Sequence, residues 1–361
     1  MTTIIIRDMA RRALERASEG RQTILYTQGG SPSVMNVVPK FLASDIKPEW
    51  PSNVFPAFQV GSITANELFI GSFHSSLSGN EVVSAPLAKP INNISQDDAI
   101  NLARVNGIGW HALTAIEWSA LALWSWRNGF VPRGNNYYGQ SYENPAESGA
   151  RIDGAAPGVT TIGNGETLAG SGPAGWRHDN TMFGVADLNG NYYDFCTGLR
   201  VVSGEIQIIT FNYGAYNTTD FSATSSAWKA IDATSGANLT PQFTGSIAGG
   251  DYVATTENSV RFSATPANGC ITIATTLAGL KTQGIGDDAL RVLTYFGLLA
   301  PAADSLVGAD AFNVTLSGER ILLKGGRSIG MTASGLFATA MSNTRSTLAT
   351  TNSFRLAYAA I

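Results

Sequence analysis

The residue types that most often carry chemistry are sparse in this sequence. Its three histidines, His74, His111 and His178, lie far apart and form no HExxH or similar spacing, so we expect each to be structural or exposed. The two cysteines, Cys196 and Cys270, are too few for a disulfide framework or a structural zinc site. We expect two buried free thiols, with a single disulfide as the alternative. No Walker loop occurs. These patterns indicate a protein that binds and does not catalyse.

The composition narrows the class of protein. Hydrophobic residues make up 44% of the 361 residues and charged residues 14%, with 39 glycines, which indicates a folded, loop-rich chain and excludes disorder. The formal net charge of −4 gives no basic field to attract nucleic acid. No stretch approaches the roughly 18 apolar residues of a membrane span, and no signal peptide is recognisable. We therefore expect synthesis in the cytoplasm and no membrane insertion.

The elements that must position a binding site include two helices with clear start signals. Ser95 and Asp98 cap a predicted helix over residues 97–106. Thr114 and Glu117 form a capping box for a second helix, in which the hydroxyl accepts a backbone N–H and the carboxylate reaches back to the first residue. The broad apolar surface of this second helix predicts burial against a sheet.

The remaining elements are an N-terminal arm, a long irregular region and a third helix. Residues 7–19 predict a short amphipathic helix that a strand follows, and we assign residues 1–35 to an arm. This arm either packs on the body or serves attachment or oligomerisation. Residues 130–180 show little periodicity, which is typical of a functional loop region, and residues 287–296 predict the third helix. Together with several short apolar runs, these elements predict an α+β fold.

Four segments stand in an order and spacing typical of one family. They are ELFIGSFHSS with VSAPLAKPINNISQDDAINLA (67–103), GWHALTAIEW (109–118), FGVADLNGNYYDF (183–195), and LKGG, Arg345-Ser346 and SFRLA within 323–357. They resemble, in turn, the first-helix entry, "R-L-P-T-E-A-E-W", "N-x-x-G-L-x-D-M-x-G-N-V-W-E-W" and "L-R-G-G-S-W … R-x-x-R … G-F-R-L-A" of the formylglycine-generating-enzyme branch of the C-type lectin fold.

The resemblance implies a domain organisation. It covers about residues 60–200 and 318–358, and implies one C-type-lectin-like domain over residues 36–361 with long loops. The two matched parts are too far apart for an ordinary loop, so we expect an inserted, mostly β segment at about residues 212–280.

The resemblance also bears on cofactors. The oxidase of this branch binds copper through two cysteines, but the corresponding positions here are Phe337 and Ser342, so we expect no such oxidase. Glu143-Asn144-Pro145 contains the residues of the Glu-Pro-Asn motif of calcium-dependent sugar binding in a different order, so we do not expect calcium-dependent sugar binding. A structural calcium ion is one interpretation of a turn whose carboxylate and amide oxygens suit a hard cation, and a plain hairpin turn is the other. The residues of this turn are Asp187, Asn189, Asn191 and Asp194.

Within the branch, the sequence most resembles phage and prophage variable proteins that retroelements diversify, such as receptor-binding proteins of the major tropism determinant type. In that group the segment corresponding to residues 325–355 is the variable, ligand-facing surface. We therefore expect a set of small polar and apolar residues there to be mostly exposed on one face. They are Arg327, Ser328, Ile329, Met331, Thr332, Ser334, Thr339, Met341, Ser342, Asn343, Thr347 and Thr350.

The function that the resemblance implies is adhesion. We expect a phage tail protein on the virion, trimeric like its relatives, that contacts other tail proteins and binds a protein or glycan receptor on the host surface. The alternative is a prophage- or bacterium-encoded display protein, extracellular or on the cell surface, with another ligand. A third functional interpretation is a catalytic member of the fold with novel chemistry. For the residues between the family positions, the alternative to a variable surface is a set of ordinary surface residues.

Overall fold

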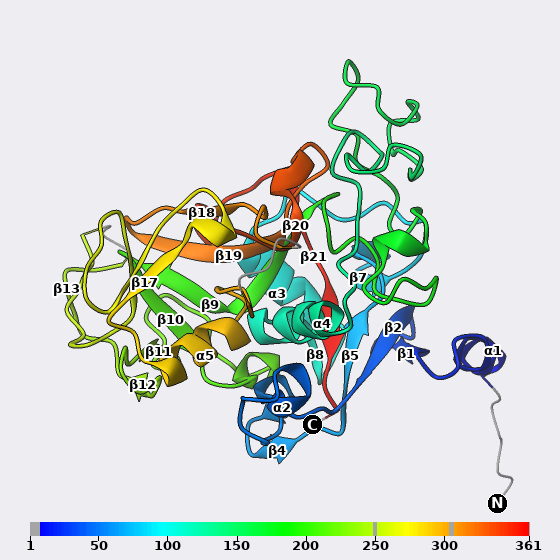
Figure 1. Cartoon of the computed structure of the whole chain (residues 1–361). Helices are drawn as coiled ribbons and strands as arrows, with labels where there is room; N and C mark the ends of the chain where they lie inside the picture. Colours follow the sequence, from blue (N-terminus) through cyan, green and yellow to red (C-terminus); the bar gives the residue numbers. More distant parts are fainter. Residues whose placement is uncertain (1–7, 248–250, 303–306, 361) are drawn as a thin grey trace, which may run out of the picture.

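A computed structural model describes residues 8–247, 251–302 and 307–360 of the chain. The fold is mixed α and β with few helices, in agreement with the predicted α+β class (Figure 1). The helices are α1 (Met9–Ala17), α2 (Ala43–Ile46), α3 (Gln96–Val105), α4 (Ala115–Arg127) and α5 (Asp287–Tyr295), with short 3₁₀ turns η1 (Pro56–Phe58), η2 (Ala174–Trp176), η3 (Tyr213–Ala215), η4 (Leu277–Gly279) and η5 (Met331–Ala333).

The first sheet, here the terminal sheet, brings the two ends of the chain together. Its antiparallel strands follow the order β1-β2-β5-β22-β8. The C-terminal strand thus lies between two strands from the first third of the chain. Their bounds are β1 (Gln22–Tyr26), β2 (Pro32–Pro39), β5 (Glu67–Gly71), β22 (Leu356–Tyr358) and β8 (Trp110–Ala112).

The second sheet, here the long sheet, has the order β17-β16-β15-β10-β9-β19-β20-β18, with β11 and β12 branching from β10 and β21 beside β9. Its strands are β9 (Tyr193–Val202), β10 (Glu205–Ile209), β11 (Trp228–Ile231), β12 (Asn238–Leu239), β15 (Arg261–Ser263), β16 (Cys270–Thr272), β17 (Lys281–Gln283), β18 (Phe312–Val314), β19 (Glu319–Gly325), β20 (Gly335–Met341) and β21 (Asn352–Phe354). Three small hairpins complete the strands: β3 (Gln59–Val60) with β4 (Ile63–Thr64), β6 (Ser75–Ser78) with β7 (Glu81–Ser84), and β13 (Phe243–Thr244) with β14 (Val253–Ala254).

Helices cover both faces of the long sheet. Trp118 and Leu121 of α4 and residues of α5 belong to the same buried cluster as Cys196 of β9. Ala99 of α3 instead clusters with Phe195, the neighbour of Cys196, on the other face. Because successive side chains of a strand point to opposite faces, β9 is buried on both sides.

Both predicted capping boxes are confirmed. Ser95 caps α3 through Asp98, and Thr114 caps α4. Thr114 Oγ1 accepts the Glu117 N–H at 3.3 Å, and Glu117 Oε2 accepts the Thr114 N–H at 3.0 Å. The helix predicted over residues 287–296 is α5, which ends one residue earlier.

The segment predicted as an insertion continues the long sheet. Within residues 212–280, β11 pairs with β10, and β15 pairs with β10 and β16. Long loops separate these short strands. The segment therefore shares the hydrogen bonding of the sheet that carries β9 and β19.

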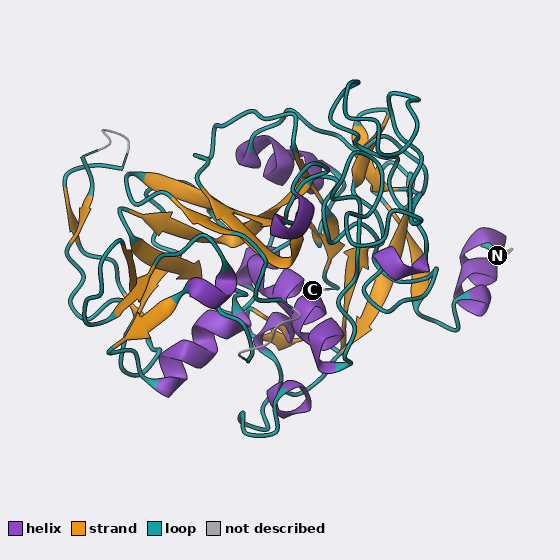
Figure 2. Ribbon diagram, turned by 45° about the horizontal axis from the view of Figure 1, so that its top comes forward, coloured by secondary structure: helices purple, strands orange, loops and turns teal. Residues whose placement is uncertain are grey.

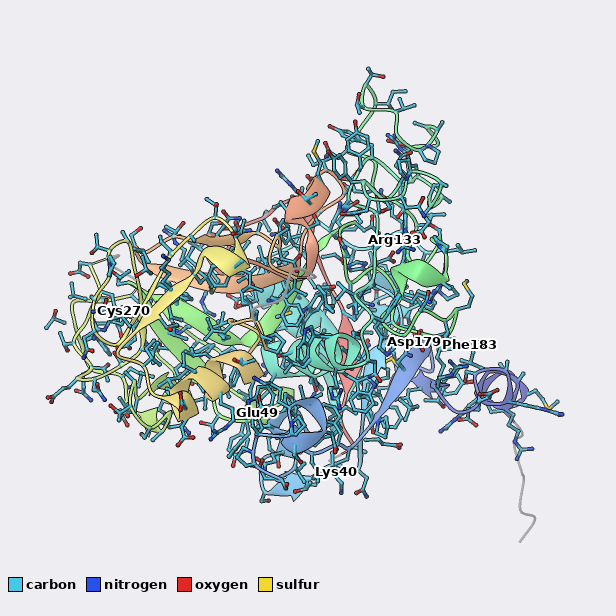
Figure 3. All side chains as sticks on the ribbon, viewed as in Figure 1. Lys40, Glu49, Arg133, Asp179, Phe183 and Cys270 are labelled. Atoms are coloured by element: carbon cyan, nitrogen blue, oxygen red, sulfur yellow. The ribbon has the colours of Figure 1, made fainter. Side chains whose placement is uncertain are left out.

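The N-terminal arm is divided between the terminal sheet and an exposed helix bonded to its first strand. The boundary expected after residue 35 falls inside β2, and β1 and β2 belong to the terminal sheet. Helix α1 buries none of its residues and lies at the edge of the molecule (Figure 2), where Thr23 Oγ1 of β1 donates to Glu15 Oε1 at 2.6 Å. Beyond it, Arg21 contacts the 130–190 region, with its guanidinium 3.7 Å from Asp179 and over the ring of Phe183, both labelled in Figure 3. The start expected for α1 at residue 7 lies outside the described residues.

The irregular region expected at residues 130–180 is present and extends to about residue 190. Apart from η2 it has no helix or long strand, and its loops gather at one end of the molecule (Figures 1 and 2). Its base is held by Arg133, labelled in Figure 3, which forms an ion pair with Glu147. No helix in the described part of the chain is long and apolar enough to cross a membrane.

Candidate ligand-binding surface

The predicted contact residues form two groups at opposite ends of one strand. Residues 327–334 precede β20, and residues 342–350 follow it. A seven-residue strand spans roughly 23 Å. The buried strand β20 therefore separates the two groups of predicted contact residues.

The strand itself exposes none of its side chains. Thr339 and Met341, expected on the surface, are 1% and 0% exposed. The expectation is wrong here because β20 lies between β19 and β18 and is covered on both faces. Met341 belongs to the main hydrophobic cluster. Thr339 Oγ1 accepts a bond of 2.7 Å from Lys324 Nζ, so it serves a buried cation.

Buried charge surrounds β20. Lys324 Nζ also donates to the Phe337 carbonyl at 3.1 Å, and burial lowers the pKa of Lys324 to about 8. Asp310 Oδ2 accepts the Phe337 N–H at 2.7 Å, and burial raises the pKa of Asp310 to about 7. A Cβ at Gly335 would lie 2.0 Å from Asp310 Oδ1. These contacts fix the start of the strand.

The loop over residues 327–334 is closed by its last side chain. Ser334 Oγ accepts the Arg327 N–H and donates to the Arg327 carbonyl, both at 3.0 Å. Ser334 is therefore buried, and its expected exposure is wrong. A Cβ at Gly326, where φ is +86°, would lie 2.3 Å from Ser334 Oγ, so only glycine permits this closure.

The same loop is anchored by its backbone to residues 134–143. The Tyr138 N–H donates to the Ser328 carbonyl at 2.8 Å. This contact buries Ser328, which was expected to be exposed. The Met331 N–H donates to the Asn136 carbonyl at 2.8 Å, and Asn136 Nδ2 donates to the Met331 carbonyl at 3.1 Å. These bonds use main-chain atoms of the loop. The outward-pointing side chains of the loop therefore take no part in them.

Asn136 is the hub of this junction. Fully buried, it accepts the Tyr142 N–H on Oδ1 at 2.7 Å while its amide bonds Glu143 at 3.0 Å. Tyr142 and Met331 are therefore positioned by one side chain. The rings of Tyr137 and Tyr142 lie 5.7 Å apart, which builds an aromatic group beside the loop.

We define the tip surface as the outward side chains of this junction: Arg327, Met331, Thr332 and Tyr142, all exposed. Met331 is 42% and Tyr142 46% exposed, so the junction presents two large side chains to solvent. Met331 also adopts a φ of +52°, a strained value for a residue with a side chain. Ile329 lies half-buried beside them.

The second group is smaller and more polar. Ser342 and Thr350 are exposed, and Asn343 and Thr347 are half-buried. Its anchor is Arg345, whose Nη2 lies 2.7 Å from Glu319. The expected contact residues of this second group therefore surround Arg345.

A salt-bridge network supports this second group. Although burial raises the pKa of Glu319, bonds from Arg345 and Arg200 hold it below its usual value. Arg345 also reaches Asp97 at the start of α3, at 3.1 Å. The loop after β20 is therefore tied to both the sheet and a helix.

The side chains considered for calcium make some bonds to protein groups, but Asp187 Oδ1, Asn189 Oδ1 and Asp194 Oδ1 are buried and have no hydrogen-bond partner among the described residues. Asp187 Oδ2 accepts a backbone N–H at 2.7 Å, and Asn189 Nδ2 donates to a backbone carbonyl at 3.0 Å. Asn191 Oδ1 accepts two N–H groups. Asp194 lies 3.4 Å from Arg355. In the described ranges, no three His, Cys, Asp or Glu side chains gather as a metal site.

The histidines play structural parts. His111 Nε2 lies 2.9 Å from Glu117 Oε1; burial opposes its charge, but Glu117 raises the pKa of His111 above its ordinary value. His74 is fully buried, 3.3 Å from Asp194. His178 Nδ1 accepts the backbone N–H of residue 185 at 2.8 Å. The expectation of structural histidines is confirmed, as is that of two buried free thiols.

The sequence interpretation missed the contribution of residues 134–143 to the tip surface. Three tyrosines among Asn, Gly and Ser in NNYYGQSY are a composition typical of binding loops. No protein-family model and no curated protein matches this chain.

Proposed function

We propose that this protein is a non-enzymatic receptor-binding protein and that the tip surface makes the contact with its receptor. One observation carries the proposal. Backbone hydrogen bonds, together with the side chains of Ser334 and Asn136, fix a loop that presents Arg327 and Met331 outward. Such a loop can change its outer side chains without loss of its shape, which is the property that a variable binding surface requires.

The tip surface has the composition of a binding site. Tyrosine, methionine and arginine are enriched at protein interfaces, and rigid aromatic anchors lose little entropy on binding. Tyr142 and Met331 supply apolar area beside the charge of Arg327. A host-surface protein or glycan is the proposed ligand.

The proposed fold is the C-type-lectin fold of the formylglycine-generating-enzyme branch. Its support is the meeting of the four resembling segments around Arg355, whose carbonyl accepts the N–H of Leu113 in the second segment at 2.9 Å. Arg355 Nη1 and Nη2 donate to the Gly71 and Ala186 carbonyls at 2.9 Å, and thereby link the first and third segments to the last. By this resemblance the protein acts in a phage tail as a trimer.

The experiment is an adsorption assay with purified protein on a panel of bacterial strains. Anchor residues of interfaces commonly contribute about 2 kcal/mol or more, so the double variant Met331→Ala/Tyr142→Ala should bind at least about 30-fold more weakly. The matched control, Ser342→Ala/Thr350→Ala, changes the second group and should bind as the wild type does.

Two results would overturn this assignment. One is unchanged adsorption of a folded Met331→Ala/Tyr142→Ala protein. The other is loss of adsorption in the control variant alone, which would move the contact to the second group. Circular dichroism of each variant verifies that the fold is kept.

A further inference from the structure

A cavity of about 270 Å³ lies over a polar strip of the long sheet, away from the tip surface. Arg200 of β9 stands opposite Gln207 of β10 in the strand register, and β11 with Trp228 lies beside them. Since Asp194 pairs with Lys324 at the tip end of β9, Arg200 lies roughly 20 Å along the strand from that end. The cavity is thus separate from the surface proposed for the receptor.

Arg200 supplies a buried cation with unused donors at this cavity. It is 3% exposed, and its Nε donates to Gln207 Oε1 at 2.9 Å. Its Nη1 donates to Glu319 Oε1 at 2.7 Å and to the Ala223 carbonyl at 2.9 Å. Among the described residues, Nη2 donates to none. Burial lowers the pKa of Arg200 to about 10, so the group is still charged at neutral pH.

Aromatic rings wall the same cavity. The Arg200 guanidinium lies 4.2 Å from the centre of the Trp228 ring, which holds it flat. Across the cavity, Phe243 stacks on Tyr252 with ring centres 4.7 Å apart and planes at 26°. Tyr252 is buried, whereas Phe243 is 51% exposed and forms an apolar rim.

Tyr252 adds a second directed donor. Gln207 Nε2 donates to the Tyr252 hydroxyl oxygen at 3.2 Å and to Glu205 Oε1 at 2.8 Å. The hydroxyl therefore accepts from Gln207, and its own proton has no acceptor in the described ranges. Together with Lys229 and a few apolar residues, serine and threonine residues also line the cavity: Thr224, Ser225, Ser226 and Thr240.

We infer that this cavity is a binding site for one sugar ring that carries a carboxylate. The volume, just under the usual range for ligand pockets, suits a single ring and no longer chain. The free Nη2 of Arg200 matches a carboxylate oxygen, which guanidinium groups bind by charge-assisted bonds. The exposed ring of Phe243 offers an apolar surface to the C–H face of the sugar ring. The serine and threonine hydroxyl groups of the cavity form hydrogen bonds with the hydroxyl groups of the sugar.

The test uses two probes that differ only in the acid group. Methyl β-D-glucuronide and methyl β-D-glucoside are titrated into the purified full chain, and binding is followed by saturation-transfer NMR and calorimetry. We expect the glucuronide to bind and the glucoside to bind about tenfold more weakly or not at all, because a charge-assisted bond is lost.

Variants locate the binding. Phe243→Ala should weaken glucuronide binding about tenfold, while Phe211→Ala, at a phenylalanine of similar exposure outside the cavity, should leave it unchanged. Arg200→Lys keeps the positive charge and removes Nη2, so a folded Arg200→Lys protein should lose the preference for the acid.

Three results would overturn the inference: no glucuronide binding at millimolar concentration, equal binding of both sugars, or equal weakening by Phe243→Ala and Phe211→Ala. Because the tip variant Met331→Ala/Tyr142→Ala leaves this cavity intact, its glucuronide affinity should equal that of the wild type. The proposal of a sugar site and the proposal of a receptor surface are therefore tested independently.

Discussion

The loop over residues 327–334 and strand β20 are adjacent in the sequence and have similar compositions of small polar and apolar residues. They differ in solvent exposure. In the loop, Met331 is 42% exposed; in the strand, Met341 is fully buried. The loop is anchored by its main chain to the 134–143 region, and the strand is paired on both sides. Two residues of the same type are therefore exposed or buried according to their tertiary neighbours.

The difference also teaches how a binding loop can vary. Where backbone atoms and a few side chains such as Ser334 fix the loop conformation, the outer side chains contribute little to the free energy of unfolding. Where side chains hold the shape, as in β20, substitution costs stability. The comparison can be tested by paired substitutions of one residue type.

The largest effect is expected at Met341. Met341→Ala leaves a cavity in the main cluster and should destabilise the protein by about 2–5 kcal/mol in urea unfolding. A loss below about 0.5 kcal/mol would show that β20 is not packed as described, and the contrast with the loop would vanish.

The next effect concerns pH and the residue that fixes the start of β20. Burial raises the pKa of Asp310 to about 7, so the folded state holds a proton that the unfolded state releases near pH 4. The stability from this group is full below about pH 4 and is lost as the pH rises to about 7, by at most about 1.4 kcal/mol per pH unit.

Asp310→Asn isolates this contribution. The amide oxygen can still accept the Phe337 N–H, but the group no longer titrates. Unfolding free energies at several pH values between 4 and 7 should fall less steeply, or rise more, with pH in the variant than in the wild type. Parallel curves for the two proteins would contradict a raised pKa.

A smaller effect is expected at the loop closure. Ser334→Ala removes both bonds to the Arg327 backbone and should cost about 1–2 kcal/mol, with weaker adsorption because the tip surface loosens. Ser342→Ala, at an exposed serine after β20, is the matched control and should change stability by less than about 0.5 kcal/mol. Equal stabilities for the two variants would mean that the loop does not depend on Ser334.

The smallest effect on stability is expected at Met331. Met331→Ala should change the unfolding free energy by less than about 0.5 kcal/mol, because its side chain is exposed and its bonds are made by the backbone. The same variant should still lower adsorption. A large loss of stability would place Met331 with Met341 and break the comparison.

Local chemistry in the sequence determined the capped helices. Ser95 with Asp98, and Thr114 with Glu117, satisfy the free N–H groups of a helix start within a few residues, so α3 and α4 could be predicted without tertiary information. The structural role of the histidines and the irregular region after residue 130 were predictable for similar reasons, since spacing and composition are local.

Tertiary structure alone decided the surface. The sequence around Met331 and Met341 has no periodicity that separates an exposed loop from a strand buried on both faces, because only pairing with β18 and β19 buries β20. The aromatic half of the tip surface comes from Tyr142, almost 190 residues earlier, through Asn136. Arg200 and Tyr252 likewise come to one cavity only through the fold, in which Gln207 of β10 is bonded to both. Such contacts join distant segments, and composition and spacing within a single segment do not encode them.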